Sequence, residues 1–252
     1  MTPELPLATG SAPPIRSPSS FERLFTVFSS PGKTFEAIAR DPHFILCWCV
    51  QIVVAAIFGA LLIQRVGIYN MARQALAQNR ATQVMPPASY QHALAISAIG
   101  MKISFYSAPL WQIVILLILA AVFLGLGNLL LGYEARYKQA LGMVSYAYLA
   151  MTLYSLVVIA VIGLTANPTS LQITNLVGTN LAFFMDKATT SPFLYALGTH
   201  LDIFAVWTVI LLGVGLAKLG GKKGKVGGAL SVVVVLWLLV ILVFSGISTA
   251  FA

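Results

Sequence analysis

Five long stretches of the chain are continuously apolar, which is the pattern of membrane-spanning helices. They cover residues 44–63, 109–131, 140–164, 201–219 and 229–252. At 1.5 Å of rise per residue, about 20 such residues cross a hydrocarbon core of about 30 Å. Strands of a membrane barrel would instead alternate with a period of two, so only helices fit these runs. The pattern predicts an all-α, polytopic integral membrane protein whose five-span domain covers residues 43–252.

The segment 21–42, just before the first span, has the pattern of short amphipathic helices. Ser19 and Glu22 have the spacing of a capping box, and Ser30 with Pro31 marks a second helix start. Apolar side chains then recur at i, i+3, i+4 and i+7: Phe21, Leu24, Phe25 and Phe28. Helices of this kind beside a span usually lie in the headgroup plane, so we expect a membrane-surface anchor. A docking helix for a cytoplasmic partner is the alternative.

Residues 1–20 have a different composition from everything that follows. They contain five of the twelve prolines and no apolar stretch of the kind found in a secretory signal. We therefore expect a disordered N-terminal tail. In the whole chain 59% of residues are hydrophobic and 9% are charged, whereas about 25% are charged in an ordinary soluble domain.

The positive charges predict both the orientation and a lipid partner. Cytoplasmic segments of membrane proteins are enriched in Lys and Arg. One side of the predicted spans would hold Arg16, Arg23, Lys33, Arg40, Arg136, Lys138, Lys218, Lys222, Lys223 and Lys225, and the other Arg65, Arg73, Arg80, Lys102 and Lys187. This excess places the N-terminus in the cytoplasm and the C-terminus outside. Because the net charge of +8 flanks the spans instead of covering a soluble face, anionic lipid is the expected partner, not nucleic acid.

The connections between the spans predict how neighbouring helices pair. The short 132–139 loop makes the second and third spans an antiparallel hairpin, and GGKKGKVGG joins the fourth and fifth. Its lysines, with Lys218, would form a cytoplasmic surface for lipid or a partner, made by Lys218, Lys222, Lys223 and Lys225. The connection 64–108 has a break at Pro86-Pro87 and a second helical stretch that starts at Ser89. An interfacial or re-entrant helix is expected within 165–198.

No pattern of residues predicts an enzyme, a cofactor or a metal site. The chain has no H-E-x-x-H, G-x-S-x-G or P-loop motif. Cys47 and Cys49 lie as near neighbours in the cytoplasmic half of the first span, where a disulfide is disfavoured. His43 shares a helical face with Cys47 only, so packing as small apolar side chains is the expected role of both cysteines.

Asp202 stands out because it is an acid at the start of an apolar run. Thr199 and Asp202 have a spacing related to the capping box, which places a carboxylate on the free N–H groups of a helix N-terminus. On the predicted topology Arg65 and Lys102 lie on the same side of the membrane as Asp202, so an ion pair between Asp202 and one of these cations is a second interpretation. The alternative is proton or ion coupling, for which His200 and Asp202 would be the site.

Three segments resemble a known family of membrane proteins. They are SSPGKTFEAIARDP before the first span, YKQALGMVSYAYLA entering the third and LDIFAVWTVILLGVGL in the fourth. These resemble the bacterial branch of the Yip family, the Ypt/Rab-interacting five-span proteins, and the resemblance covers roughly residues 20–250. Eukaryotic members are linked to Rab-type GTPases through a D-L-Y-G-P motif. That motif is absent here, so the resemblance does not imply GTPase binding, nor does it imply catalytic residues.

Taken together, these features predict a Yip-like, non-enzymatic membrane scaffold or adaptor. It would lie in a bacterial inner membrane and contact the bilayer, its anionic lipids and a membrane or cytoplasmic protein partner. A homo-oligomer is a further alternative for its assembly. The alternative is a transporter or permease subunit that uses the polar residues of the bundle, although an odd number of spans and the lack of an evident repeat argue against it.

Overall fold

The computed structural model describes residues 17–77, 82, 84–171, 176–187 and 189–250. The predicted tail, residues 1–20, lies outside this part of the chain except for its last four residues. Within the described residues the fold is all-α, as predicted, with no strand. The α-helices are α1 (Ser20–Ser29), α2 (Pro31–Arg40), α3 (Ile45–Leu61), α4 (Ile68–Ala77), α6 (Pro87–Gly125), α7 (Tyr137–Ala147), α8 (Leu149–Leu164), α9 (Pro192–His200), α10 (Ile203–Leu219) and α11 (Val226–Ala250).

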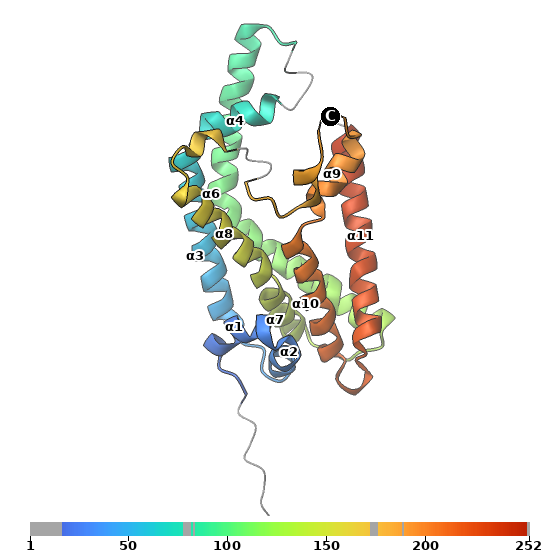
Figure 1. The fold of residues 1–252 in the computed structure, drawn as a ribbon. Coiled ribbons are helices and arrows are strands. Elements are labelled where there is room, and N and C mark those ends of the chain that lie inside the picture. The colour runs from blue at the N-terminus through green and yellow to red at the C-terminus, as the bar shows by residue number, and fades with distance from the viewer. Residues whose placement is uncertain (1–16, 78–81, 83, 172–175, 188, 251–252) are drawn as a thin grey trace, which may run out of the picture.

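Four helical stretches in the described residues are long and apolar enough to cross a membrane. They are Ile45–Ala77, Pro87–Leu130, Tyr137–Leu164 and Val226–Thr249. The protein is therefore an integral membrane protein. The remaining predicted span, 201–219, is shorter than expected: α10 has 17 residues, a length of about 25 Å against a hydrocarbon core of about 30 Å. It begins below α9 and runs to the end of the bundle that carries α2 (Figure 1).

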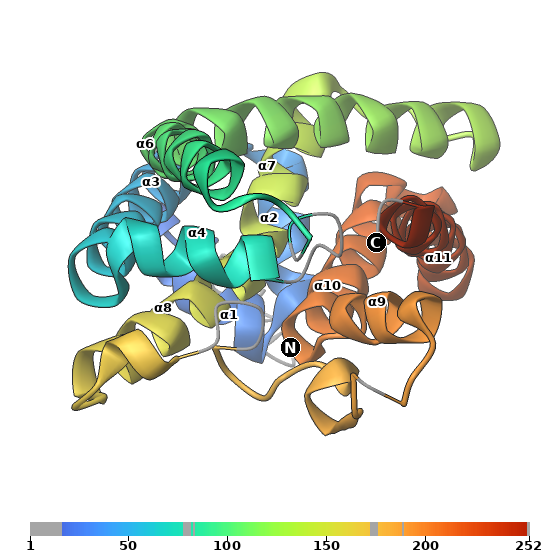
Figure 2. The ribbon, with the colours of Figure 1, turned by 90° about the horizontal axis from the view of Figure 1, so that it is seen from above.

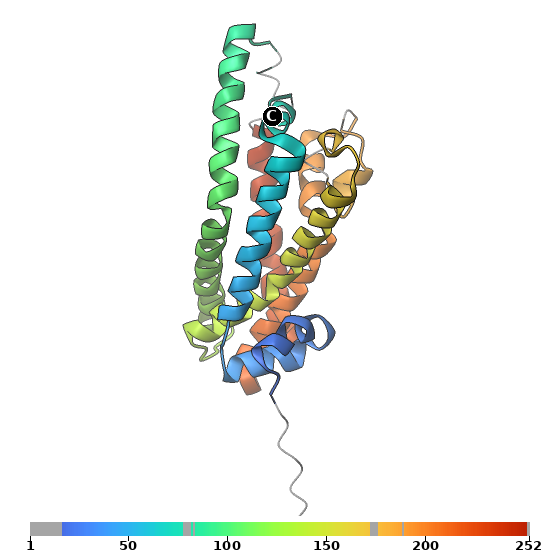
Figure 3. The ribbon, with the colours of Figure 1, turned by 90° about the vertical axis from the view of Figure 1, so that its left-hand side faces the viewer.

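Two predicted spans lie in helical stretches whose course differs from a simple single helix of the predicted length. Residues 87–108 are not a separate stretch before a span at 109–131: α6 is one helix of 39 residues with Pro109 inside it. Proline removes one intrahelical hydrogen bond but does not end this helix, which packs against α3, α4 and α7. Its length is about 58 Å, and its N-terminal end extends past the rest of the bundle (Figure 3). Conversely, the predicted span 140–164 is broken at Tyr148 into α7 and α8.

Two further helical features were not predicted. Helix α3 continues through a π-helical segment, Leu62–Gly67, into α4, which turns away at Gly67, a glycine with φ of 89°. The connection 165–198 has two 3-10 turns, Pro168–Ser170 and Leu181–Phe184, followed by α9. Residues 172–175 lie outside the described residues, and the described middle of the connection, 176–187, forms the second 3-10 turn instead of the predicted interfacial or re-entrant helix.

The two ends of the bundle are built from different segments. Helices α1 and α2, the start of α7 and the α10–α11 connection lie at one end, while α4, α9 and the end of α11 lie at the other (Figure 1). Seen along the bundle, α3, α4 and the N-terminal part of α6 lie on one side and α9, α10 and α11 on the other, while the rest of α6 runs along the edge of the bundle from the first side to the second (Figure 2). Helix α10 packs against α2, α7, α8 and α11, and α7 and α8 in turn contact α6 and α3, so the two sides are joined through α7 and α8.

Close packing of α10 against its neighbours depends on two glycines. A Cβ on Gly215 would lie 2.5 Å from Met143 Cγ of α7, and a Cβ on Gly213 would lie 2.9 Å from the Cα of Leu230 in α11. Real Cβ atoms do not approach other atoms so closely. The large buried side chains of the same core include Phe35 and Leu211, so α2, α7, α10 and α11 share one packed interior.

Gly213→Ala is expected to destabilise the protein by about 1–3 kcal/mol, the usual cost of overpacking, because the obstructing atom belongs to the backbone of α11. The measurement is thermal unfolding of the purified protein in detergent. Gly228→Ala is the control: its Cβ meets no atom within 4 Å, so it should be neutral or stabilising by about 0.5–1 kcal/mol. Equal effects of the two alanines would contradict the proposed close contact.

Candidate functional site

The end of the bundle that carries α1 and α2 begins with a capping box. The Ser19 hydroxyl accepts a hydrogen bond from the Glu22 N–H at 3.2 Å, and the Glu22 carboxylate accepts one from the Ser19 N–H at 2.6 Å. This predicted start of α1 is confirmed. Ser30 is the N-cap residue of α2 with Pro31 at the first position, as predicted, but its side chain makes no capping hydrogen bond.

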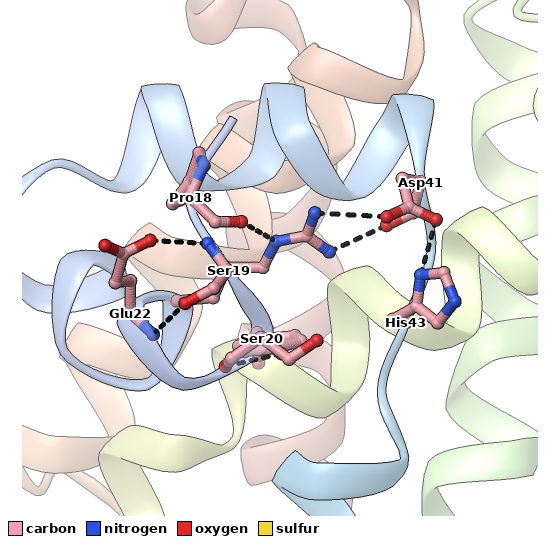
Figure 4. A network of polar contacts seen from close by, with 8 residues as sticks. Pro18, Ser19, Ser20, Glu22, Asp41 and His43 are labelled. Atoms are coloured by element: carbon pink, nitrogen blue, oxygen red, sulfur yellow. Dashed lines mark hydrogen bonds and ion pairs between the residues drawn. The ribbon is translucent and has the colours of Figure 1, made fainter. Parts of the chain in front are cut away.

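A buried arginine ties α1 to the segment that leads into the first span (Figure 4). The side chain of Arg23 is 3% exposed, and its guanidinium donates to Pro18 O at 3.0 Å, Asp41 O at 2.7 Å and Asp41 Oδ2 at 3.4 Å. The other oxygen of Asp41 pairs with His43 Nδ1. A buried guanidinium is tolerated only when its donors are used, as they are here. From its sequence position Arg23 is expected only as a flanking charge, because nothing local predicts its distant partner.

The apolar stripe predicted on α1 packs only partly against the core: two of its four side chains face inward and two are exposed. Leu24 and Phe28 pack against the core, and the Phe28 ring meets Trp207 of α10 at a centroid distance of 5.5 Å. Phe21 and Phe25 are instead 63% exposed each and contact one another edge-to-face at 5.4 Å. Helix α1 thus leaves a pair of aromatic rings on the outside of the protein.

The four predicted surface lysines lie at this same end. Lys218 approaches Glu36 of α2 at 3.9 Å, and Lys223 contacts Glu134 at 3.0 Å. Lys222 and Lys225 are exposed and form no ion pair with any described residue. We call the rings of Phe21 and Phe25 together with these four lysines the aromatic–cationic face.

Asp202 lies at the opposite end of α10, where it is the N-cap residue. Its Oδ1 accepts hydrogen bonds from the N–H groups of Phe204 at 2.8 Å and Ala205 at 3.4 Å, and its Oδ2 accepts one from the Thr179 hydroxyl. The backbone on either side is also paired, since Ile203 N–H donates to Thr179 O at 3.1 Å. One carboxylate therefore starts α10 and fixes the chain segment that precedes α9.

The other residues predicted around this cap lie elsewhere. Thr199 is in the preceding helix, α9, and its hydroxyl donates to Ala196 O, so it forms no capping box with the aspartate. Arg65 donates to Thr165 O at 3.2 Å. Lys102 is exposed on α6. Among the described residues neither cation forms an ion pair with the cap carboxylate. Thr179, which does contact it, was missed because 23 residues separate the two.

Polar side chains inside the bundle gather around the break between α7 and α8. The Gln51 amide of α3 donates to Ser145 O at 2.7 Å, and Trp48 Nε1 donates to the Ser145 hydroxyl at 2.7 Å. Cys47, which is buried, also donates to Ser145 O, while Cys49 is exposed. Gln112 of α6 donates to Gln51 Oε1 at 2.9 Å. This cluster therefore links α3, α6 and α7.

Three polar residues of the spans form hydrogen bonds with separate partners. Asn128 exchanges two hydrogen bonds with the backbone of Ala135 in the α6–α7 connection, and Asp202 caps α10, whereas Gln112 belongs to the cluster around Ser145. In the same described residues, no three His, Cys, Asp or Glu side chains come together in a way that could hold a metal ion.

Asp202→Asn should retain nearly all the stability of the protein, because an amide oxygen still accepts from the α10 N–H groups and only the charge–dipole interaction, about 0.3–1 kcal/mol, is lost. Asp202→Leu should cost about 0.5–2 kcal/mol, because it removes the cap itself. Thermal unfolding in detergent measures both. An Asn variant that is folded yet as impaired in function as the Leu variant would contradict a purely capping role.

Comparison with known proteins identifies the family. The model of the Yip1 domain matches residues 25–247, which include α2 to α10 completely, half of α1 and most of α11. No curated protein and no solved structure matches the chain. The match extends over nearly the whole sequence and agrees with the resemblance seen in its three segments. The chain therefore belongs to the Yip1 domain family.

Proposed function

We propose that this Yip1 domain protein is a non-enzymatic membrane scaffold that uses its aromatic–cationic face to hold a protein partner beside anionic lipid. The observation that carries the proposal is the exposed pair of Phe21 and Phe25 at the same end of the bundle as Lys222 and Lys225. Aromatic rings and unpaired cations are the groups that insert into a headgroup region or anchor a partner.

The rigid attachment of α1 supports this role. Arg23 fixes the helix to the segment after α2, and Phe28 packs on α10, so the two exposed rings are held in place before anything binds. A preformed surface loses less conformational freedom on binding than a mobile one. The proposal therefore treats α1 as part of the folded bundle, with its exposed rings as the contact.

We place this face in the cytoplasm of a bacterial cell, with the protein in the inner membrane. The end with α1, α2 and the α10–α11 connection carries most of the Lys and Arg residues, and the end with α4 and α9 carries fewer. The positive-inside rule supports this orientation. The five passes of α3, α6, α7–α8, α10 and α11 then leave the end of α11 outside.

The alternative of a transporter has weaker support. Transport needs a path that opens to each side in turn, and binding sites usually lie where broken helices meet near the midplane. The break between α7 and α8 at Tyr148 supplies a broken helix, which is one of these features. However, Asn128, Gln112 and Asp202 bond to separate partners and line no common path in the described residues.

Proximity labelling from an enzyme fused to the N-terminus tests the scaffold. Phe21→Ala with Phe25→Ala should remove most of the proteins that the unchanged chain labels reproducibly, because the contact would lose both rings. The matched control is Phe184→Ala, which removes an exposed ring, 76% exposed, at the other end of the bundle. A labelled set that is the same in all three chains, or no reproducible set at all, argues against the proposed scaffold.

Reporter fusions test the orientation. A fluorescent protein that folds only in the cytoplasm should fluoresce when it is fused to the N-terminus and stay dark when it is fused to the C-terminus. Alkaline phosphatase, which is active only outside the cytoplasm, should give the opposite pattern. Both ends reporting the same compartment would mean that α10 does not cross the bilayer, and would move the aromatic–cationic face or the end of α11 to the other side.

A further inference from the structure

A cavity of about 560 Å³ lies between α3, α6 and α8, halfway along the spans. Thr152, one of its lining residues, is near the middle of the 28-residue stretch Tyr137–Leu164. Gln51 and Gln112, which link α3 to α6, also line it. The volume is within the range of small-molecule sites in proteins, about 300–1,000 Å³.

The backbone is irregular on two sides of this cavity. Pro109 interrupts the hydrogen bonds of α6 next to Ala108, and the break between α7 and α8 falls at Tyr148; both Ala108 and Tyr148 line the cavity. Inside a membrane such interruptions occur where the backbone is buried in protein or borders a cavity. In many membrane proteins they mark the place where a ligand is held.

Several polar side chains of the lining have hydrogen-bonding capacity to spare. An amide side chain offers two donors and an acceptor with two lone pairs. Among the described residues Gln112 makes only one hydrogen bond, to Gln51, and the phenol groups of Tyr148 and Tyr154 make none. The Thr152 hydroxyl donates to Tyr148 O, which leaves its oxygen as an acceptor. The cavity can therefore both donate to and accept from a neutral polar group.

The occupant must be uncharged and must come from the bilayer. No described lining residue is an Asp, Glu, Lys, Arg or His, so a phosphate or an ammonium would be buried at this depth without a counter-charge, which is strongly unfavourable. Trp111 and Ile115 line the cavity from α6 and are 60% and 47% exposed at mid-span, where the surroundings are lipid chains. Entry is therefore sideways, from the lipid.

From these features we infer that the cavity binds an uncharged lipid with hydroxyl or ester groups, of the diacylglycerol class. Its glycerol and ester oxygens would meet Gln112, Tyr148 and Tyr154, and an acyl chain would leave between Trp111 and Ile115. A phospholipid with the same chains is rejected because its charged headgroup has no partner at this depth. This site is separate from the aromatic–cationic face and does not depend on the scaffold role.

The test uses the full-length protein in membranes with a photoactivatable diacylglycerol, and a phosphatidylglycerol with the same photoactivatable chain for comparison. Diacylglycerol should label peptides of α6 and α8 at least five times more than the phospholipid does. Ala108→Phe, which fills the cavity, should reduce this labelling about tenfold. Ala121→Phe is the matched control: it adds the same ring to an exposed position of α6 outside the cavity and should leave labelling within twofold.

Gln112→Leu removes the amide at nearly constant volume, so it should reduce the preference for diacylglycerol over phosphatidylglycerol to about one. Equal labelling by the two lipids in the unchanged chain, or full labelling of a folded Ala108→Phe chain, would overturn the inference. If the Ala108→Phe variant does not fold, the test is competition: the unchanged protein is labelled in the presence of excess unlabelled diacylglycerol. Labelling that excess diacylglycerol lowers supports the site, and labelling that it leaves constant overturns it.

Discussion

Within the hydrocarbon of a membrane, every backbone N–H and C=O must find a partner inside the protein, and this constraint organises the whole fold. Uninterrupted helices meet it by themselves. Where the helices of this protein are interrupted, a polar side chain supplies the missing partner: Asp202 accepts from the first N–H groups of α10, Gln51 donates to Ser145 O beside the α7–α8 break, and Asn128 pairs with Ala135 after α6. Several of the sparse polar residues of the spans therefore lie where the helices begin, break or end.

The sequence predicted those features that depend on residues near one another in the chain. The apolar runs gave the all-α membrane class, and the capping box at Ser19 and Glu22 follows from a spacing of three residues. Helix boundaries were harder to predict. The apolar run indicated a span that begins at residue 109, but α6, which packs on α3 and α7, is continuous through Pro109, while the break at Tyr148 occurs in a run with no proline or charge.

Contacts between distant residues explain most of what was missed in the candidate site. Helical periodicity places Phe21, Leu24, Phe25 and Phe28 on one stripe. Only the tertiary structure shows that Leu24 and Phe28 pack against the core and α10, whereas Phe21 and Phe25 remain exposed. In the same way, Arg23 finds its partner in Asp41, 18 residues away. The family match covers these segments without assigning a role to any residue in them.

The length of α6 has a mechanical consequence. A single helix of about 58 Å crosses the lipid and continues into the adjacent aqueous layer with no loop between the two parts. A bilayer that becomes thinner or thicker changes the tilt of its helices, and a tilt of about 10° would displace the far tip of a rod this long by roughly 10 Å. The length of α6 therefore converts a small change of tilt into a large displacement of its N-terminal end.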